Sequence, residues 1–114
     1  MSIVNTAIYD KLIEVAKEGT TVSYGELGRV ADISFDTEVG VKILGLALDI
    51  IADQELGEGR PLLPVVAVAA NGRPDARLFD YARRKHIQEM DDASFFAAEL
   101  KRVHDYWAKA KKPG

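Results

Sequence analysis

The spacing of apolar residues predicts that the chain opens with a helix. Ile8, Leu12 and Val15 recur at intervals of four and three residues, which places them on one helical face. Asn5 or Thr6 can cap this helix at its start, because their side-chain oxygens accept hydrogen bonds from first-turn amides.

The next segment carries turn, strand and capping signals in close succession. Gly19 is suited to end the first helix, because glycine adopts positive φ without strain. Residues 20–22 are rich in β-branched side chains and favour a short strand. Ser23 and Glu26 have the Ser-x-x-Glu spacing of a capping box. Together these signals predict a second helix over about residues 24–31.

The longest predicted helix covers residues 37–56, and either Asp36 or Thr37 can cap it. One apolar stripe in it is formed by Val39, Ile43, Leu46 and Ile50, and this stripe is widened by Leu44, Leu48 and Ile51. An arc of this width is typical of a central helix packed on several neighbours. We therefore expect the apolar residues to be buried and four positions to face water: Glu38, Lys42, Asp49 and Asp53.

The second half begins with a nearly continuous apolar run over residues 62–70, which predicts a strand covered by helices. Asn71-Gly72 favours a tight turn back, and Arg73-Pro74 suits an edge or loop. Residues 78–85 fit either a short helix or the end of a returning strand.

A last helix is predicted to start at Asp91 or Asp92, because four apolar residues beyond them recur at helical spacing: Phe96, Leu100, Val103 and Trp107. The order of helix, short strand, helix, long helix, then strand and turn is that of a winged helix-turn-helix. We therefore predict one α+β domain over residues 1–114, a compact winged helix-turn-helix-like fold of four to five helices with a small β-sheet.

The composition is that of an ordinary folded domain, and it excludes several kinds of functional site. Hydrophobic residues make up 47% and charged residues 29% of the chain, and cysteine is absent. Disulfides, thiol nucleophiles and thiolate metal sites are thereby excluded, which fits a reducing cytosol. The first residues lack the pattern of a signal peptide, and the longest apolar stretch, residues 39–52, is too short to cross a bilayer. We expect a cytoplasmic protein without a membrane anchor.

Few residues offer catalytic or metal-binding chemistry. His86 and His104 are the only histidines, and they lack the organised spacing of three or four metal ligands. No nucleophile elbow surrounds Ser23, whose capping role suffices to explain it. We therefore expect no metal, no cofactor and no enzymatic activity. A hydrolase or nuclease with an unfamiliar site is the remote alternative.

The net charge of −3 hides an asymmetry between the two halves of the chain. Residues 1–60 hold five Lys or Arg against eleven Asp or Glu, whereas residues 61–114 hold ten against seven. The second half offers five candidates for contact with a phosphate backbone, at the predicted turn and in the segment after it: Arg73, Arg77, Arg83, Arg84 and Lys85. The alternative is a solvated face balanced by acidic residues.

Residues 21–27 read Thr-Val-Ser-Tyr-Gly-Glu-Leu. This sequence motif, together with the order of elements over about residues 6–74, resembles the DNA-binding half of the alkylguanine-DNA alkyltransferases and their alkyltransferase-like relatives. The resemblance implies a helix-turn-helix in which Tyr24 helps to distort DNA near a flipped base. The long helix would be the recognition helix, and in place of the family's arginine it offers Lys42. Packing within the fold is the alternative role of Tyr24.

The chemistry of that family does not carry over to this chain. Its Pro-Cys-His-Arg motif would fall near residues 63–66, which read Leu-Pro-Val-Val, and alkyl transfer to a thiolate requires a cysteine. The chain also resembles a group of small bacterial proteins without an assigned activity. They share its Tyr-Gly-Glu-Leu opening, the Gly-x-Pro-Leu-Leu segment at 59–63 and a closing aromatic helix that ends in Tyr106-Trp107.

Two functions follow as hypotheses. The first is a non-enzymatic binding module that contacts double-stranded DNA with low sequence specificity, through the Arg73 turn and the basic segment 77–85, with Tyr24 and Lys42. The second is a protein–protein interaction module that kept the winged-helix scaffold and lost the DNA surface. A contiguous Arg/Lys face would favour the first, and an acidic long helix with an exposed apolar strip would favour the second. The oligomeric state stays open.

Overall fold

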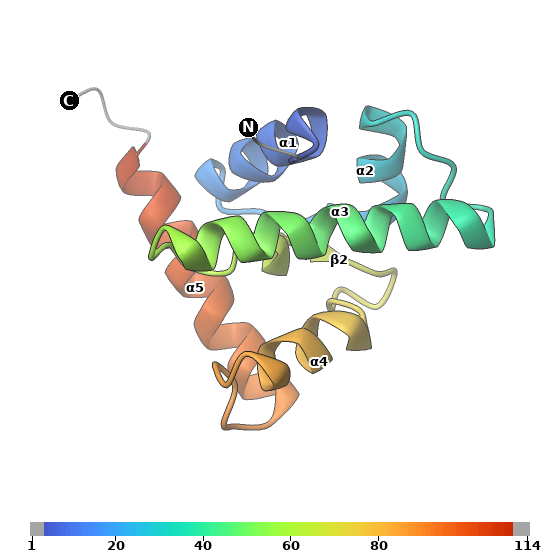
Figure 1. Cartoon of the computed structure of the whole chain (residues 1–114). Coiled ribbons are helices and arrows are strands. Elements are labelled where there is room, and N and C mark those ends of the chain that lie inside the picture. The colour runs from blue at the N-terminus through green and yellow to red at the C-terminus, as the bar shows by residue number, and fades with distance from the viewer. Residues whose placement is uncertain (1–3, 111–114) are drawn as a thin grey trace.

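The computed structural model describes residues 4–110, in which five α-helices and one 3-10 helix surround a sheet of two strands (Figure 1). In chain order the elements are α1 (Thr6–Lys17), β1 (Val22–Ser23), α2 (Tyr24–Val30), α3 (Glu38–Gly57), η1 (Leu63–Val66), β2 (Ala67–Val68), α4 (Ala76–Arg84) and α5 (Asp92–Ala110). The prediction of a small α+β domain is confirmed, and the helices dominate it.

Side-chain caps begin four of the helices and settle the alternatives that the sequence left open. The cap of α1 is Asn5, that of α2 is Ser23 and that of α3 is Thr37, each accepting a hydrogen bond from an amide in the first turn. Asp91 does the same at the start of α5, where its carboxylate accepts from the Ser94 amide at 2.8 Å. These local contacts explain why the predicted helix starts are accurate.

The sheet consists of two short parallel strands, with Val22 opposite Ala67 and Ser23 opposite Val68. The strand predicted within residues 62–70 is confirmed only at Ala67–Val68, because residues 63–66 form the 3-10 helix η1 instead. Pro64 lies in the first turn of η1 and has no amide hydrogen to donate to a strand ladder. The continuous apolar run nevertheless lies inside the protein, as expected, since all four side chains of η1 are buried.

The predicted tight turn at Asn71-Gly72 is confirmed. Gly72 has a φ of 80°, and its amide donates to the Ala69 carbonyl at 2.9 Å. The Ala69 amide donates to the Arg73 carbonyl at 2.8 Å, which closes the turn. Beyond it the chain enters α4, so the segment that fitted either a helix or a strand is helical. The winged-helix assignment stays a prediction, because the two strands described are parallel and no returning strand follows β2 within residues 4–110.

The core is built around η1, against which α1, α3 and α5 all pack. Figure 1 shows α3 crossing the molecule, with α1 and α2 on one side of it and α4 on the other, while α5 begins near α4 and runs past the end of α3 to the side of α1. Apolar side chains from these elements form the main buried cluster, which includes Ile8, Leu12, Leu44, Ile51, Val65 and Trp107. A smaller cluster joins the end of α3 to α4 and α5, and it includes Ala52, Phe79, Tyr81 and Phe95.

The burial of α3 differs from the prediction. Its buried residues are Gly40, Leu44, Ile51, Ala52 and Glu55. The stripe expected in the core faces outwards instead: Val39 is 67%, Ile43 47% and Leu46 57% exposed. The helix carries two apolar stripes, and only one of them meets the core.

Close contacts at two glycines explain which side of α3 faces the rest of the protein. A Cβ at Gly40 would lie 1.6 Å from the Ser34 carbonyl oxygen, so this side of the helix is pressed against the preceding loop. A Cβ at Gly45 would lie 3.0 Å from the Arg77 side chain, so the long side chain of Arg77 covers this side of the helix. With these two sides occupied, the Val39 stripe is turned towards solvent.

Candidate functional site

The basic segment of α4 is exposed, but acidic side chains from neighbouring elements accompany it. Arg77 forms an ion pair with Asp49 of α3 at 2.8 Å, and Lys85 lies 3.6 Å from Asp53 of the same helix. Arg83 contacts two carboxylates, those of Asp80 in α4 and of Asp92 at the start of α5. The contiguous face of unpaired Arg and Lys that DNA binding would favour is therefore absent from this segment.

Arg77 and Arg84, which are two helical turns apart in α4, lie on one face of that helix, and Lys42 lies near them. All three line one shallow depression between α3 and α4. Three carboxylates line the same depression, those of Asp49, Asp75 and Asp80. Basic and acidic groups thus balance, and the depression has no strong excess of positive charge with which to attract phosphate. Arg73 lies apart in the turn before α4, and its side chain is exposed.

Tyr81 is the centre of a polar cluster on α4. Its hydroxyl donates to the Asp53 carboxylate at 2.5 Å. The Arg84 guanidinium and the Lys85 ammonium lie 5.7 and 5.6 Å from the centre of its ring, a distance typical of cation–π contacts. Burial, together with the hydrogen bond to Asp53, raises the pKa of Tyr81 above its ordinary value. Arg84 and Lys85 therefore both contact the ring of Tyr81 within the folded chain.

Tyr24 ties α2 to the segment before α4. Its ring stacks on Phe35 with the ring centres 5.9 Å apart, and its hydroxyl accepts a hydrogen bond from the Asp75 amide at 2.8 Å. Burial raises the pKa of Tyr24, so the hydroxyl stays protonated at neutral pH. Both the ring and the hydroxyl are thus used in packing, the alternative role given to this residue from the sequence.

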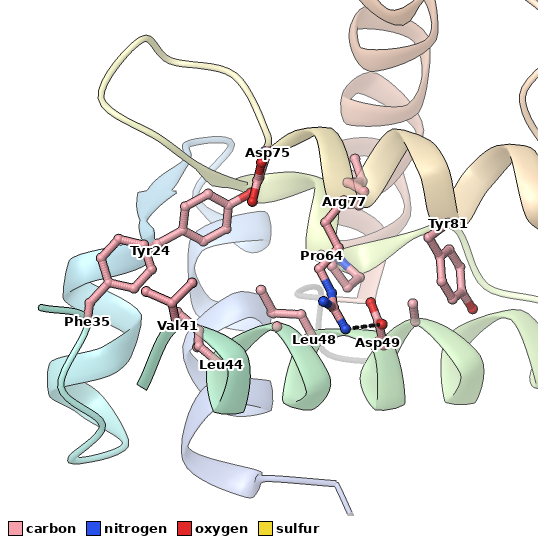
Figure 2. A pocket seen from close by; sticks show the side chains of 13 residues that line it. Tyr24, Phe35, Val41, Leu44, Leu48, Asp49, Pro64, Asp75, Arg77 and Tyr81 are labelled. Carbon is pink, nitrogen blue, oxygen red and sulfur yellow. Dashed lines mark hydrogen bonds and ion pairs between the residues drawn. The ribbon is translucent and has the colours of Figure 1, made fainter. Parts of the chain in front are cut away.

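A small pocket lies between α3 and α4 (Figure 2). Tyr24 and Phe35 form one end of it, Tyr81 lies at the other, and the Asp49–Arg77 ion pair bridges the two helices. Its walls are mainly apolar, with Leu44, Leu48 and Pro64 among the lining residues. The pocket has a volume of about 60 Å³, which accommodates only a small group.

The most distinctive surface is the outer face of α3, which we call the α3 strip and define as Val39, Ile43, Leu46 and Ile50. The first three side chains are exposed and Ile50 is half-buried. Charged residues border the strip: Lys42 is exposed beside it, and Asp53 is exposed at its C-terminal end. The sequence showed these apolar residues and their helical spacing. It gave no sign of which apolar stripe would face the solvent.

A buried carboxylate was also missed by the sequence-based prediction. Glu55 of α3 is 0% exposed and forms an ion pair with Arg60, which follows the helix. The Arg60 amide donates to the Glu55 carbonyl at 2.9 Å, so both backbone and side chain hold the loop against the helix end. Tyr9 lies beside this pair, and burial, then the proximity of Glu55, raises the pKa of its hydroxyl. Glu55 thus has a structural role at the junction of α3 with the loop.

No site for a metal ion is formed within residues 4–110, where no three His, Asp or Glu side chains gather closely enough. The ring of His104 lies with its Nε2 atom 3.0 Å from the Thr20 carbonyl oxygen, and His86 is exposed. Across the same described part of the chain, no helix is long and apolar enough to cross a membrane.

Comparisons with family models, with curated proteins and with solved structures gave no match to this chain. Inferences about function therefore rest on the geometry of its own surfaces.

Proposed function

We propose that this chain is a protein–protein interaction module that binds its partner through the α3 strip. One observation carries the proposal: Val39, Ile43 and Leu46, on successive turns of one helix, are 67%, 47% and 57% exposed. Single exposed apolar residues are common on proteins, whereas aligned groups of them mark interaction surfaces.

The energetics favour covering this surface. Full burial of a Val, Leu or Ile side chain is worth roughly 1.5–3 kcal/mol, so a partner that covers the strip gains several kcal/mol from it. Lys42 beside the strip and Asp53 at its C-terminal end contribute to the polar rim that surrounds the apolar centre of most interfaces. A helix face of this kind fits a partner that offers a complementary apolar helix or groove.

The same face argues against sequence reading by α3. A recognition helix presents side chains that form hydrogen bonds with base edges, such as Arg, Lys, Asn or Gln. At the outward positions of α3 this chain has Val39, Ile43 and Leu46, with Lys42 beside them. Double-stranded DNA is the second candidate partner, and the exposed Arg73 in the turn before α4 is the feature that favours it.

Site-specific photo-crosslinking tests the proposal. A benzophenone amino acid replaces Leu46 in the α3 strip and, as the control, Met90, which is 50% exposed in the loop between α4 and α5. In cells that make the protein naturally, we expect a discrete protein adduct from position 46 and none from position 90. Equal yields from the two positions, or none from either, would contradict the assignment of the interface to α3.

A further inference from the structure

We propose that the partner at the α3 strip is a second copy of this chain, with the two α3 helices packed antiparallel across a twofold axis. This rests on the interaction function proposed above and names its partner. Two features of α3 carry it: the spacing of the apolar residues in the strip and the charges that flank them.

The spacing is that of a short coiled-coil seam. Val39, Ile43, Leu46 and Ile50 follow one another at intervals of four, three and four residues, which is the 3.5-residue repeat at which two helices pack side by side. In heptad terms Ile43 and Ile50 occupy a positions, and Val39 and Leu46 occupy d positions. A second α3 is the complementary apolar helix that such a seam requires, and this chain supplies one at equal concentration.

The charges select the antiparallel orientation. In an antiparallel pair each a residue packs against a d residue of the other helix, so Ile43 meets the second copy's Leu46 and Val39 meets its Ile50. Lys42 and Asp49 both hold the g position, and g faces g in this arrangement. Lys42 of each copy therefore lies opposite Asp49 of the other, and the twofold axis produces this contact twice.

A parallel pair in register lacks this gain. There g faces e of the other helix, which places Lys42 opposite Ala47 and Asp49 opposite Gln54. Lys42 takes part in none of the ion pairs formed within residues 4–110, so it is free to meet a carboxylate of another copy. Asp49 already contacts Arg77 but keeps 28% of its side chain exposed. The antiparallel pair thus gains two ion pairs that the parallel pair does not form.

The small area of contact between two α3 helices limits the expected affinity of the dimer. A single pair of helices buries less than the roughly 1,200–2,000 Å² of a standard interface, so the dimer is expected to dissociate on dilution. We therefore expect a weak and reversible association that is detected only at high protein concentration.

Disulfide trapping tests the orientation, and the absence of native cysteine makes any introduced thiol unique. A tagged Val39→Cys chain is mixed with an untagged Ile50→Cys chain under mild oxidation. The antiparallel pair brings these two positions together, whereas two copies of position 39 stay about 16 Å apart along the helix axis, because eleven residues rise by about 1.5 Å each. We expect the tagged–untagged heterodimer to form at least about tenfold faster than either homodimer.

Each other result overturns the proposal. Faster homodimer formation would show a parallel pair, and cross-linking no faster than that of a Met90→Cys control would show that α3 is not a self-interface. Circular dichroism and thermal melts of both variants exclude misfolding as the reason for a negative result.

The photo-crosslinking experiment separates this failure from failure of the proposed function. An adduct from position 46 with twice the mass of the chain supports self-association. An adduct with a different protein, together with slow disulfide trapping, retains the interaction function and rejects the second copy. The lack of any adduct from position 46 rejects both.

Discussion

Arg77 of α4 and Asp49 of α3, which are 28 residues apart in sequence, form an ion pair of 2.8 Å across the pocket between the two helices (Figure 2). Lys85 and Asp53 form a second, longer contact between the same helices at 3.6 Å. The residues that the sequence offers for DNA contact are thus partly neutralised by the acidic side of α3.

The acidic partners should therefore limit DNA affinity. Asp49→Asn combined with Asp53→Asn removes two negative charges beside Arg77 and Lys85. We expect this variant to bind a mixed-sequence duplex in a salt-dependent manner and more tightly than the wild type. Fluorescence anisotropy at about 50 and 200 mM salt measures this. An Asp10→Asn, Glu18→Gln variant carries the same change of charge on exposed positions of the first helix and its end.

The DNA affinity of the Asp49→Asn, Asp53→Asn variant must rise more than that of this control. Only then do the carboxylates beside Arg77 and Lys85, rather than the net charge, account for the change. Steeply salt-dependent binding by the wild type would instead restore the DNA hypothesis. Arg77→Glu with Arg84→Glu would then show whether the basic segment is the surface, since that reversal should abolish the affinity and leave folding intact.

Gly40 should be far less tolerant than Gly57, although both lie in α3. Gly40→Ala introduces a Cβ 1.6 Å from the Ser34 carbonyl oxygen, and relief requires movement of the helix or the loop. We expect a loss of about 2–4 kcal/mol in the free energy of unfolding, measured with urea. A Cβ at Gly57 meets no atom within 4 Å, so Gly57→Ala should be neutral or stabilise by up to about 1 kcal/mol. Equal effects would contradict the close packing at Gly40.

The packing of α3 also illustrates what the sequence could and could not predict. Helix starts were predictable because caps such as Ser23 and Thr37 act on amides three residues away. The choice of the buried side of α3 was not, because both stripes have the same helical period. It depends on the contact of Gly40 with a loop and on the contact of the Arg77 side chain with Gly45.

The candidate site was predictable in its residue types and not in its contacts. The basic character of α4 and the proximity of Arg77 to Arg84 follow from the sequence, since seven residues make two helical turns. The pairing of Arg77 with Asp49 depends on tertiary packing between distant segments. The 3-10 helix at residues 63–66 escaped prediction for a related reason, since a continuous apolar run has no period that distinguishes a strand from a buried turn of helix.

Glu55 should contribute to stability through its contact with Arg60. Glu55→Gln keeps the size of the side chain but removes the buried charge that pairs with the guanidinium, and Arg60 retains access to water. We expect a loss of about 1–3 kcal/mol in the free energy of unfolding at neutral pH. Glu58→Gln, at an exposed position near the helix end, should change it by less than about 0.5 kcal/mol. A neutral Glu55→Gln variant would show that the pair contributes nothing to folding.

The protein should lose stability in alkaline solution as buried tyrosines ionise. Burial raises the pKa of Tyr24 and Tyr81 above the ordinary value of 10.0, and the hydrogen bond to Asp53 adds to the effect at Tyr81. The folded protein therefore holds these protons more tightly than the unfolded chain, so stability is complete below about pH 10 and falls as the pH rises beyond it. Urea unfolding between about pH 8 and 11 measures the slope, which Tyr81→Phe should reduce. An unchanged slope in that variant would exclude Tyr81 as a cause.

The central claim is that two copies of this chain associate through the outer face of α3, and sedimentation velocity over rising concentration tests this claim most directly. We expect the wild type to pass from monomer to dimer, and Leu46→Glu to stay monomeric while its free energy of unfolding changes by less than about 1 kcal/mol, because Leu46 is 57% exposed. Met90→Glu should associate as the wild type does. A wild type that stays monomeric at millimolar concentration, or a Leu46→Glu variant that dimerises equally well, would contradict the account.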